Sequence, residues 1–212
     1  MPIDHKKSST IFSQRKIYEK GGIGRWYWDF RDKIIFSFIK EEHKNILDIG
    51  CGEGITLEKL INKYKNSKVI NGIDVMEENV KICQGLGLPV ISVSVYDLKL
   101  KFGKDSVDLC ILSETIEHLE NVELAFDNLR RVLKIGGEVI IVFPNDFIIK
   151  MARLFFFKFK EAFADAGHLR KFTPKTLREL LENNGFEIVL SQNIPFWSWI
   201  ISLHGIIVAR KI

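Results

Sequence analysis

Short apolar runs alternate with longer amphipathic segments through the middle of the chain, a pattern typical of strands alternating with helices in a parallel sheet. After residue 144 the pattern changes, and the chain ends in a capped helix and two apolar segments. Thr173 is predicted as the helix N-cap, with Pro174 in the first turn and Gly185 just past the end. Strands are predicted at residues 45–49, 68–74, 89–94, 107–112, 138–143, 186–191 and 205–211, and helices at 29–39, 56–64, 77–86, from Ser113 to about Leu133, and from Pro174.

The N-terminal part of the chain carries a different signal. Residues 1–15 are polar and are predicted to be loose. Residues 18–28 combine three glycines with a dense aromatic group, and we interpret them as a mobile segment ahead of the first helix. Trp26, Tyr27 and Trp28 are predicted to pack against the sheet rather than to contact a ligand.

Composition narrows the class of protein. With 212 residues and 46% hydrophobic content, one α/β domain with a sizeable core is expected. The net charge of +4 is modest and its basic residues are scattered, which argues against a nucleic-acid stripe. Three cysteines without C-x-x-C spacing fit a reducing compartment. No apolar leader is visible, so a cytoplasmic location is expected.

The stretch from Asn45 to Gly54 is the centre of the predicted fold. A short apolar strand leads into three alternating glycines, Gly50, Gly52 and Gly54, after which a helix opens. Glycine allows a tight turn and a close ligand approach, and the following helix N-terminus presents backbone N–H groups. The spacing G-x-G-x-G differs from the G-x-G-x-x-G of dinucleotide sites. The alternatives are a structural turn or an NAD site.

Two acidic residues favour a cationic ligand. Asp48 lies two residues before Gly50, where it would repel a pyrophosphate but suits the ammonium and sulfonium of S-adenosylmethionine (SAM). Asp74 ends the next strand, about 20 residues on, where a carboxylate takes ribose hydroxyls. With these residues in register, the chain resembles the class I SAM-dependent methyltransferases over residues 30–190, and within them the ubiquinone-biosynthesis O-methyltransferase-like (methyltransferase type 11/12) group.

The resemblance implies a Rossmann-like fold. Its seven-stranded, mostly parallel sheet has the order 3-2-1-4-5-7-6, strand 7 antiparallel and helices on both faces. It divides the single domain, 1–212, into an N-terminal segment or lid (1–40), a SAM-binding core (41–143), a substrate-side cap (144–172) and a C-terminal helix with two strands (173–212). It also implies SAM as cofactor and S-adenosylhomocysteine as product. The implied cofactor-binding residues are Arg31, Asp48, Gly50, Cys51, Gly52, Gly54, Asp74, Val75, Asp97, Leu98 and Ser113.

The methyl acceptor has to be inferred from the residues beyond the fourth strand. An Asn/Asp-Pro-Pro-aromatic turn, as in amide and exocyclic N-methyltransferases, is missing from this position, and Cys110 lies inside an apolar strand, where a nucleophile is not expected. The residues present are S-E-T-I-E-H-L, 113–119, similar to the ubiquinone O-methyltransferases. A hydroxyl acceptor must lose a proton, which an imidazole can take, so His118 is the first candidate general base.

The same residues form E-x-x-E-H and leave a metal site open. Glu114, Glu117 and His118 could converge on a helix and bind Mg²⁺, Mn²⁺ or Zn²⁺. The small-RNA 2′-O-methyltransferases use this spacing with a further histidine, for which His168 is available. An RNA 2′-O-methyltransferase is therefore the second hypothesis, and the metal is not favoured. A non-catalytic module that binds SAM or a nucleotide is the third.

The remaining predictions concern the acceptor side. Glu114, His118, Asn145, His168 and Arg170 are predicted to line the acceptor pocket. Two apolar segments, 147–163 and 194–204, are expected to pack on the sheet as a cap. The alternative is a lipid tunnel or an interfacial helix, which would suit a lipid-like acceptor and peripheral membrane contact. A small-molecule or lipid-like partner is thus expected, and nucleic acid is not.

Overall fold

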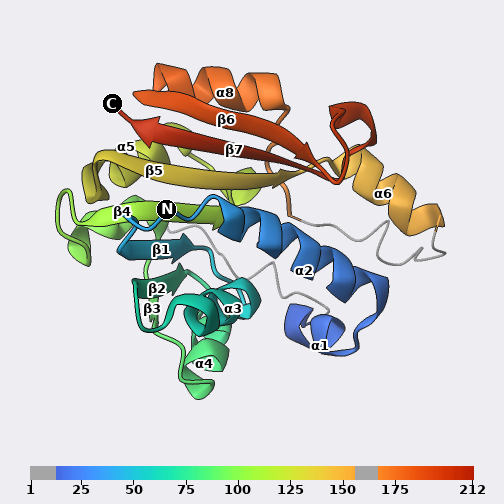
Figure 1. Ribbon diagram of the computed structural model, residues 1–212, viewed down its shortest axis with the longest axis horizontal. Coiled ribbons are helices and arrows are strands. Elements are labelled where there is room, and N and C mark those ends of the chain that lie inside the picture. Colours follow the sequence, from blue (N-terminus) through green and yellow to red (C-terminus); the bar gives the residue numbers. More distant parts are fainter. Residues whose placement is uncertain (1–12, 156–166) are drawn as a thin grey trace.

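The computed structural model describes residues 13–155 and 167–212, and a single seven-stranded sheet runs through their centre (Figure 1). Strands β1 to β5 pair in parallel, whereas β7 is antiparallel to β5 and to β6. The order β3-β2-β1-β4-β5-β7-β6 confirms the predicted topology. The strands are β1 (Asn45–Ile49), β2 (Val69–Asp74), β3 (Val90–Ser92), β4 (Val107–Ser113), β5 (Leu133–Pro144), β6 (Phe186–Ile194) and β7 (His204–Lys211).

Helices cover both faces of the sheet, as predicted. On one face α2 (Gly22–Ser37), α3 (Ile55–Tyr64) and α4 (Glu77–Gly85) share a hydrophobic cluster with the strands. On the other face α5 (Val122–Val132) and α8 (Pro174–Asn183) form the second cluster. The buried residues of α5 follow the spacing of one helical face and include Val122, Phe126 and Leu129. The short elements are α1 (Gln14–Glu19), α6 (Asp146–Phe155) and the 3-10 turns η2 (Val95–Leu100), η3 (Ile116–His118) and η4 (Trp199–Ile201).

The N-terminal region is more ordered than the sequence predicted. Gly21 and Gly22, with φ values of 78° and 77°, form a turn between α1 and α2. Helix α2 therefore begins at Gly22, not at Asp29, and most of residues 18–28 belong to helices α1 and α2 rather than to a segment ahead of the first helix. Positive φ is a conformation that glycine adopts without steric cost, so the glycine pair serves as a tight connection.

The single helix predicted from Ser113 to Leu133 is also wrong. The chain forms the short turn η3, becomes extended at Leu119, and starts α5 only after the N-cap Asn121. Glu114 has a φ of 54°, outside any right-handed helix, and its N–H bonds to the Val142 carbonyl at 2.9 Å. The i, i+3 argument that grouped Glu114 with Glu117 therefore does not apply.

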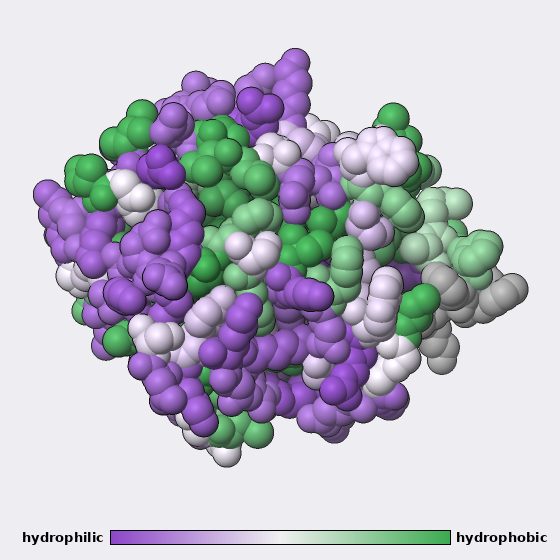
Figure 2. Space-filling view, viewed as in Figure 1, coloured by the Kyte–Doolittle hydropathy of each residue, from purple (hydrophilic) through white to green (hydrophobic). Residues whose placement is uncertain are grey.

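The apolar segments after β5 lie at one end of the molecule, where Figure 2 shows hydrophobic side chains gathered over α6 and the loop before β7. Helix α6 has no fully buried residue, although Ile148, Ile149 and Leu154 are half-buried, so the packing of this part of the predicted cap stays a prediction. Residues 156–163 of that cap lie outside the described residues. In the loop, Trp199 packs against Phe143 with ring centroids 5.4 Å apart, while Trp197 is 87% exposed. No described helix is long and apolar enough to cross a membrane.

Candidate active site

The glycine turn follows β1 at the carboxyl edge of the sheet, where the strand order reverses between β1 and β4 and a ligand crevice is expected. Gly50, Gly52 and Gly54 all have positive φ, from 55° to 76°. A Cβ at Gly50 would lie 2.6 Å from Thr115, and one at Gly54 would lie 2.6 Å from Leu88. At Gly52 the nearest atom in the described chain is 3.7 Å away. Two glycines are therefore required by packing, and the middle one leaves space.

Asp48 supplies an uncompensated negative charge beneath this turn. The residue is 3% exposed, and its Oδ2 atom has no hydrogen-bond partner among the described residues. Burial, with the nearby carboxylates of Asp32 and Asp74 adding to its effect and Arg31 opposing it, raises the pKa of Asp48 to about 7. A buried carboxylate without a partner is costly, so the site favours a ligand that brings positive charge.

Asp74 is fixed in place at the end of β2. One carboxylate oxygen accepts the Gly52 N–H at 2.8 Å, and the other accepts the Met76 N–H at 2.8 Å and the Asn79 amide at 3.2 Å. These bonds join the glycine turn to the loop after β2. The carboxylate oxygens retain further acceptor capacity for the ribose hydroxyls predicted to bind there.

Three other predicted cofactor residues surround the loops after β2 and β3. Val75 is 54% exposed beside Asp74, Asp97 is exposed in η2, and the Leu98 side chain is fully buried in the core. Leu98 can therefore offer only its backbone to a ligand. Their roles toward SAM stay predictions.

Helix α1 lies over the glycine turn because Glu53 caps its N-terminus. The Glu53 carboxylate accepts the backbone N–H groups of Gln14 and Arg15 at 3.2 and 2.8 Å, and the Ser13 hydroxyl at 2.7 Å. The Arg15 guanidinium returns to the Glu53 carbonyl at 2.9 and 3.1 Å. The capping role of Glu53 was not predicted from the sequence, because an acidic residue between two glycines matches no known motif spacing.

Helix α2 is anchored on α3 by buried charges. Asp32, 1% exposed, accepts Lys59 Nζ at 2.6 Å and the Arg31 guanidinium at 3.1 Å. Arg31, predicted to hold the SAM carboxylate, also forms an ion pair with Glu114 at the end of β4. The guanidinium therefore lies at the crevice between α2 and the sheet.

His204, which the sequence analysis did not assign, and Tyr27, which it predicted only to pack against the sheet, meet on the other side of Glu114. His204, the first residue of β7, has its Nε2 3.4 Å from Glu114 Oε1. Its Nδ1 lies 2.7 Å from the hydroxyl of Tyr27 on α2. No sequence spacing links positions 27, 114 and 204, because the contact depends on the antiparallel register of β7.

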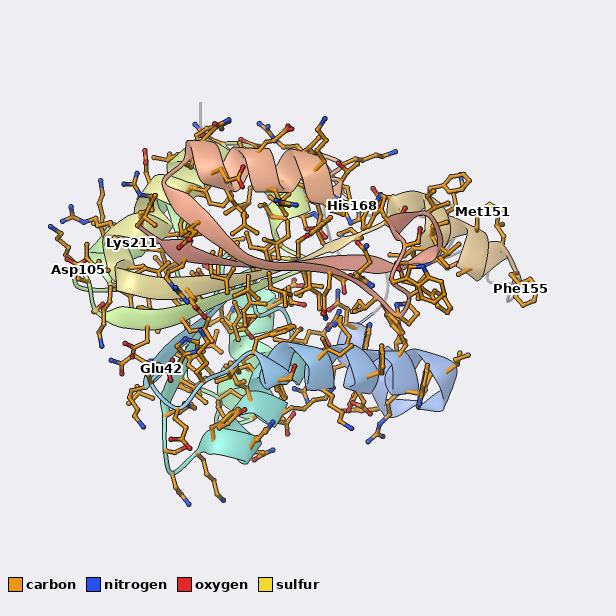
Figure 3. All side chains as sticks on the ribbon, turned by 45° about the horizontal axis from the view of Figure 1, so that its top comes forward. Glu42, Asp105, Met151, Phe155, His168 and Lys211 are labelled. Carbon is orange, nitrogen blue, oxygen red and sulfur yellow. The ribbon has the colours of Figure 1, made fainter. Side chains whose placement is uncertain are left out.

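Glu117, His118 and His168 form a second cluster below α6, where Figure 3 shows His168 at the same end as Met151. Their ligand atoms lie within 4.8 Å of one another. Glu117 is 1% exposed, and both of its carboxylate oxygens are without hydrogen-bond partners in the described chain. Burial raises the pKa of Glu117 well above its ordinary value, with Glu114 adding to it. Glu114, grouped with this set by spacing, is instead paired with Arg31.

The two histidines of this cluster have defined partners. His168 Nδ1 lies 2.7 Å from Asp146, and His118 Nδ1 lies 3.1 Å from the Gly167 carbonyl. A carbonyl can only accept, so neutral His118 carries its proton on Nδ1 and keeps a lone pair on Nε2. Burial lowers the pKa of His118, which keeps this nitrogen unprotonated at neutral pH. The same lone pair suits a proton acceptor or a metal ligand.

The other predicted acceptor residues bond to neighbouring loops. The Arg170 guanidinium donates to the Glu120 carbonyl at 2.8 Å, and Asn145 donates to the Trp199 carbonyl at 2.7 Å. Both therefore hold the loops around the cluster, and their contact with an acceptor stays a prediction. The Ser113 hydroxyl is buried without a partner among the described residues.

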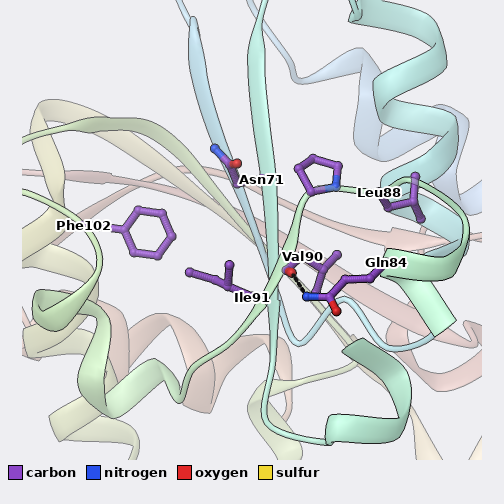
Figure 4. Close-up of a pocket in the computed structure, with 7 residues that line it drawn as sticks. Asn71, Gln84, Leu88, Val90, Ile91 and Phe102 are labelled. Carbon is purple, nitrogen blue, oxygen red and sulfur yellow. Dashed lines mark hydrogen bonds between the residues drawn. The ribbon is translucent and has the colours of Figure 1, made fainter. Parts of the chain in front are cut away.

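A cavity of about 380 Å³ lies elsewhere, at the edge strand β3 (Figure 4). Its lining includes Asn71, three residues before Asp74 on β2, together with Gln84 and Phe102. The Gln84 amide donates to the Val90 carbonyl at 3.1 Å. None of the predicted cofactor residues lines this cavity, so we do not place the cofactor there.

Comparison with known proteins identifies the family. A family model described as "Methyltransferase domain" matches residues 27–191. A malonyl-[acyl-carrier protein] O-methyltransferase of Ilyobacter polytropus is 32% identical over 65% of this chain and 54% of its own length. The mitochondrial ubiquinone biosynthesis O-methyltransferase of Rattus norvegicus is 28% identical over 73% of this chain and 49% of its own. The chain thus spans about half the length of these two relatives.

Solved structures share the fold. A SAM-dependent methyltransferase from Archaeoglobus fulgidus superimposes with a TM-score of 0.69 at 18% identity, covering 91% of this chain and 96% of that one. A Thermotoga maritima protein described as a possible histamine N-methyltransferase gives a TM-score of 0.66 at 20% identity, covering 93% and 97%. At this identity the likeness concerns the fold alone.

The chain belongs to the methyltransferase domain family. SAM is accordingly its cofactor, and the site fits that ligand: the unpartnered Asp48 oxygen calls for a cation, and the space at Gly52 lets a ligand approach the turn. Arg31 and Asp74 complete the set that would hold it, at its carboxylate and its ribose.

Proposed function

We propose that the protein transfers the methyl group of SAM to a hydroxyl oxygen of a small or lipid-like acceptor. SAM supplies an electrophilic methyl carbon on a positively charged sulfur. When the methyl group is transferred, the carbon–sulfur bond breaks and its electrons stay on the sulfur. The protein has to align the acceptor with that carbon, exclude water and receive the hydroxyl proton. The observation that carries the proposal is the His118 imidazole beside the crevice, whose Nε2 lone pair is available.

The residues around the crevice support transfer to oxygen. Ser113 and Glu114 occupy the position where N-methyltransferases hold an amine with a proline-rich turn. Two relatives have names that specify O-methyltransferases. Exposed apolar side chains on α6 and in the loop before β7, such as Phe147 and Ile200, support an acceptor with an apolar part.

The cofactor half of the proposal is tested by calorimetry with SAM and with NAD. Asp74→Ala removes charge-assisted hydrogen bonds to ribose worth ~1.5–3 kcal/mol, so SAM affinity falls roughly tenfold or more. Asp127→Ala on the exposed side of α5 is the control and leaves the affinity unchanged. Binding of NAD without binding of SAM would refute the proposal.

The acceptor half is tested with His118→Gln. If His118 is the general base, turnover falls ~10²-fold or more while SAM affinity stays within a factor of two. If turnover persists in His118→Gln and in the presence of a chelator, neither His118 nor a bound metal is required, and another group receives the hydroxyl proton of the acceptor.

A second candidate function, RNA 2′-O-methylation with a divalent metal, is favoured by one observation. Glu117, His118 and His168 offer one carboxylate and two imidazoles around the unpartnered Glu117 oxygens. Such a set suits Mg²⁺, Mn²⁺ or Zn²⁺. In that case a chelator abolishes transfer, and His168→Gln weakens Mn²⁺ binding measured by electron paramagnetic resonance. Absence of transfer to RNA by the wild-type protein in the presence of Mn²⁺ would refute this alternative.

A further inference from the structure

Tyr27, His204 and Glu114 form a chain of polar contacts that links three distant parts of the sequence. The Tyr27 hydroxyl lies 2.7 Å from His204 Nδ1, and His204 Nε2 lies 3.4 Å from Glu114 Oε1. We propose that these side chains are a proton relay for the methyl acceptor, as the alternative to His118 as general base: Tyr27 contacts the acceptor hydroxyl, His204 takes the proton, and Glu114 holds the imidazolium. The relay rests on the proposed function for its reaction, but its geometry can be tested separately.

The hydrogen-bond order in the relay follows from the charge of Glu114. Burial raises the pKa of Glu114, but the Arg31 guanidinium is the first of the groups that outweigh this effect, and the pKa lies far below its ordinary value. Glu114 is therefore ionised. His204 Nε2 is buried without a hydrogen-bond partner among the described residues, 3.4 Å from this carboxylate, where an N–H is favoured over a lone pair, so the proton of neutral His204 belongs on Nε2. Nδ1 then keeps its lone pair and accepts the Tyr27 O–H. This order directs a proton from Tyr27 toward His204.

The exposure of the three residues shows where an acceptor can enter. His204 is 4% exposed, and its ring stacks on Tyr27 with centroids 5.6 Å apart and planes 24° from parallel. Tyr27 is half-buried and thus partly accessible. An acceptor therefore cannot reach the imidazole directly, and we place its contact at the half-buried Tyr27 rather than at Glu114, whose side chain is 38% exposed.

The relay also lies at the correct edge of the sheet. His204 pairs with Pro144 at the carboxyl end of β5, and Ser113 pairs with Val142 two positions earlier on the same strand. Glu114, the next residue after β4, reaches His204 by adopting a φ of 54°. A non-glycine residue in this region is uncommon and occurs often at functional sites.

The proton is accounted for at each atom. As the acceptor oxygen bonds to the methyl carbon, its proton passes to the Tyr27 oxygen, and the proton of Tyr27 passes to His204 Nδ1. His204 becomes an imidazolium between Tyr27 and Glu114, and the same path in reverse returns the proton to solvent. Burial and Glu114 raise the pKa of Tyr27, so the phenol does not ionise alone and passes the proton on.

The first experiment compares Tyr27→Phe with Tyr64→Phe, using tritiated SAM and catechol, a hydroxybenzoate and a long-chain alcohol as acceptor probes. Both variants keep the ring and lose one hydroxyl, and that of Tyr64 contacts only the Phe36 carbonyl, at 3.3 Å, in the described structure. We expect Tyr27→Phe to lower kcat ~10²-fold with SAM affinity within twofold, and Tyr64→Phe to match the wild type. Equal kcat values for the two variants would overturn the relay.

The second experiment needs no turnover. Nitrogen-15 NMR of labelled histidine reports which ring nitrogen of His204 carries the proton, with His204→Gln used for assignment. The relay requires the Nε2–H form at neutral pH, and a change in the Nδ1 shift in Tyr27→Phe. An Nδ1–H form would overturn it. A wild-type protein that methylates none of the probes contradicts the proposed function instead, and the NMR result still decides the relay.

Discussion

Arg31 on α2 and Glu114 after β4 form an ion pair across the crevice that SAM is expected to enter. Arg31 is 7% exposed and also bonds to Asp32, so its guanidinium has a fixed position. If Arg31 holds the SAM carboxylate, that carboxylate has to bind the guanidinium together with Glu114 or displace Glu114 from it. The pair therefore connects cofactor binding to the residue that faces His204.

We predict that Arg31→Lys weakens binding of S-adenosylhomocysteine about tenfold, because lysine keeps the charge but loses the two-pronged contact. 5′-Methylthioadenosine, which lacks the amino-acid carboxylate, should bind the variant and the wild type equally. Calorimetry with both ligands checks this. Equal losses for the two ligands would mean that Arg31 supports the fold of α2 rather than the carboxylate.

Asp48 should make the empty protein less stable as pH rises. Its pKa is about 7 in the folded chain, against an ordinary value of 3.8. Between these values the folded state holds a proton that the unfolded chain has lost, so stability falls through that window by ~2–4 kcal/mol. Urea unfolding at pH 4.5 and 7.5 measures the decrease, and Asp48→Asn should flatten it.

SAM should reverse the effect at Asp48, because a bound cation favours the ionised carboxylate. Binding at pH 6.5 is then accompanied by proton release, seen as a dependence of the calorimetric enthalpy on the buffer. The release should disappear in Asp48→Asn. Identical proton release by the variant and the wild type would show that Asp48 is not the group that loses a proton when the positively charged ligand binds.

Local signals in the sequence were sufficient for the parallel core and for the glycine turn. Alternating strands and helices predicted the parallel sheet, the family resemblance supplied its strand order and the antiparallel last strand, and Gly50, Asp48 and Asp74 lie where a strand-end pattern places them. The acceptor side was less predictable. Glu114 leaves the helical conformation because its N–H bonds to Val142, on a strand nearly 30 residues further along the chain.

His204 shows the same limit. Its sequence neighbours suggest only a strand start, and its contact with Tyr27 results from the β5–β7 register and the placement of α2. Hydrogen bonds between residues so far apart have no periodicity to reveal them. The residues that decide the proton's path were therefore the ones least accessible to sequence analysis.

Glu138, near the start of β5 and far from the glycine turn at the carboxyl ends of the strands, should make the protein sensitive to acid. It is 1% exposed and accepts Lys40 Nζ at 2.6 Å and Arg210 at 2.9 Å. Burial raises its pKa, but His43, Lys40 and Arg210 outweigh this and lower it to about 2. The resulting stability, ~2–3 kcal/mol, is present above pH 4.5 and lost as pH falls toward 2.

Acid titration followed by circular dichroism checks this prediction. Glu138→Gln should unfold more easily at pH 7 and lose stability less steeply below pH 4.5. Glu179→Gln, at an exposed position beside Lys175, serves as control and should behave as the wild type. An acid transition with the same steepness in Glu138→Gln and wild type would assign it to other carboxylates.

Trp197 and Ile200 lead to the last prediction, that this end of the molecule contacts lipid surfaces. They are 87% and 77% exposed in the loop before β7, and Phe147 on α6 adds a side chain 69% exposed. Residues 194–209 contain no formal charge, and Lys150 and Arg153 provide positive charge on α6. Exposed aromatic and apolar residues with nearby basic groups are typical of proteins that bind the membrane interface.

Sedimentation with vesicles containing an anionic phospholipid measures this contact at low and high salt. We expect Trp197→Ser with Ile200→Ser to reduce the bound fraction at least tenfold, since two exposed apolar anchors are lost. Ile135→Ser is the control, because Ile135 is 78% exposed near the start of β5, at the opposite end of that strand from α6. A salt-sensitive wild-type interaction that only the double variant loses would support a lipid-like acceptor taken from the interface. Absence of vesicle binding by the wild type, with turnover on short soluble alcohols only, would exclude both the membrane contact and the lipid-like acceptor.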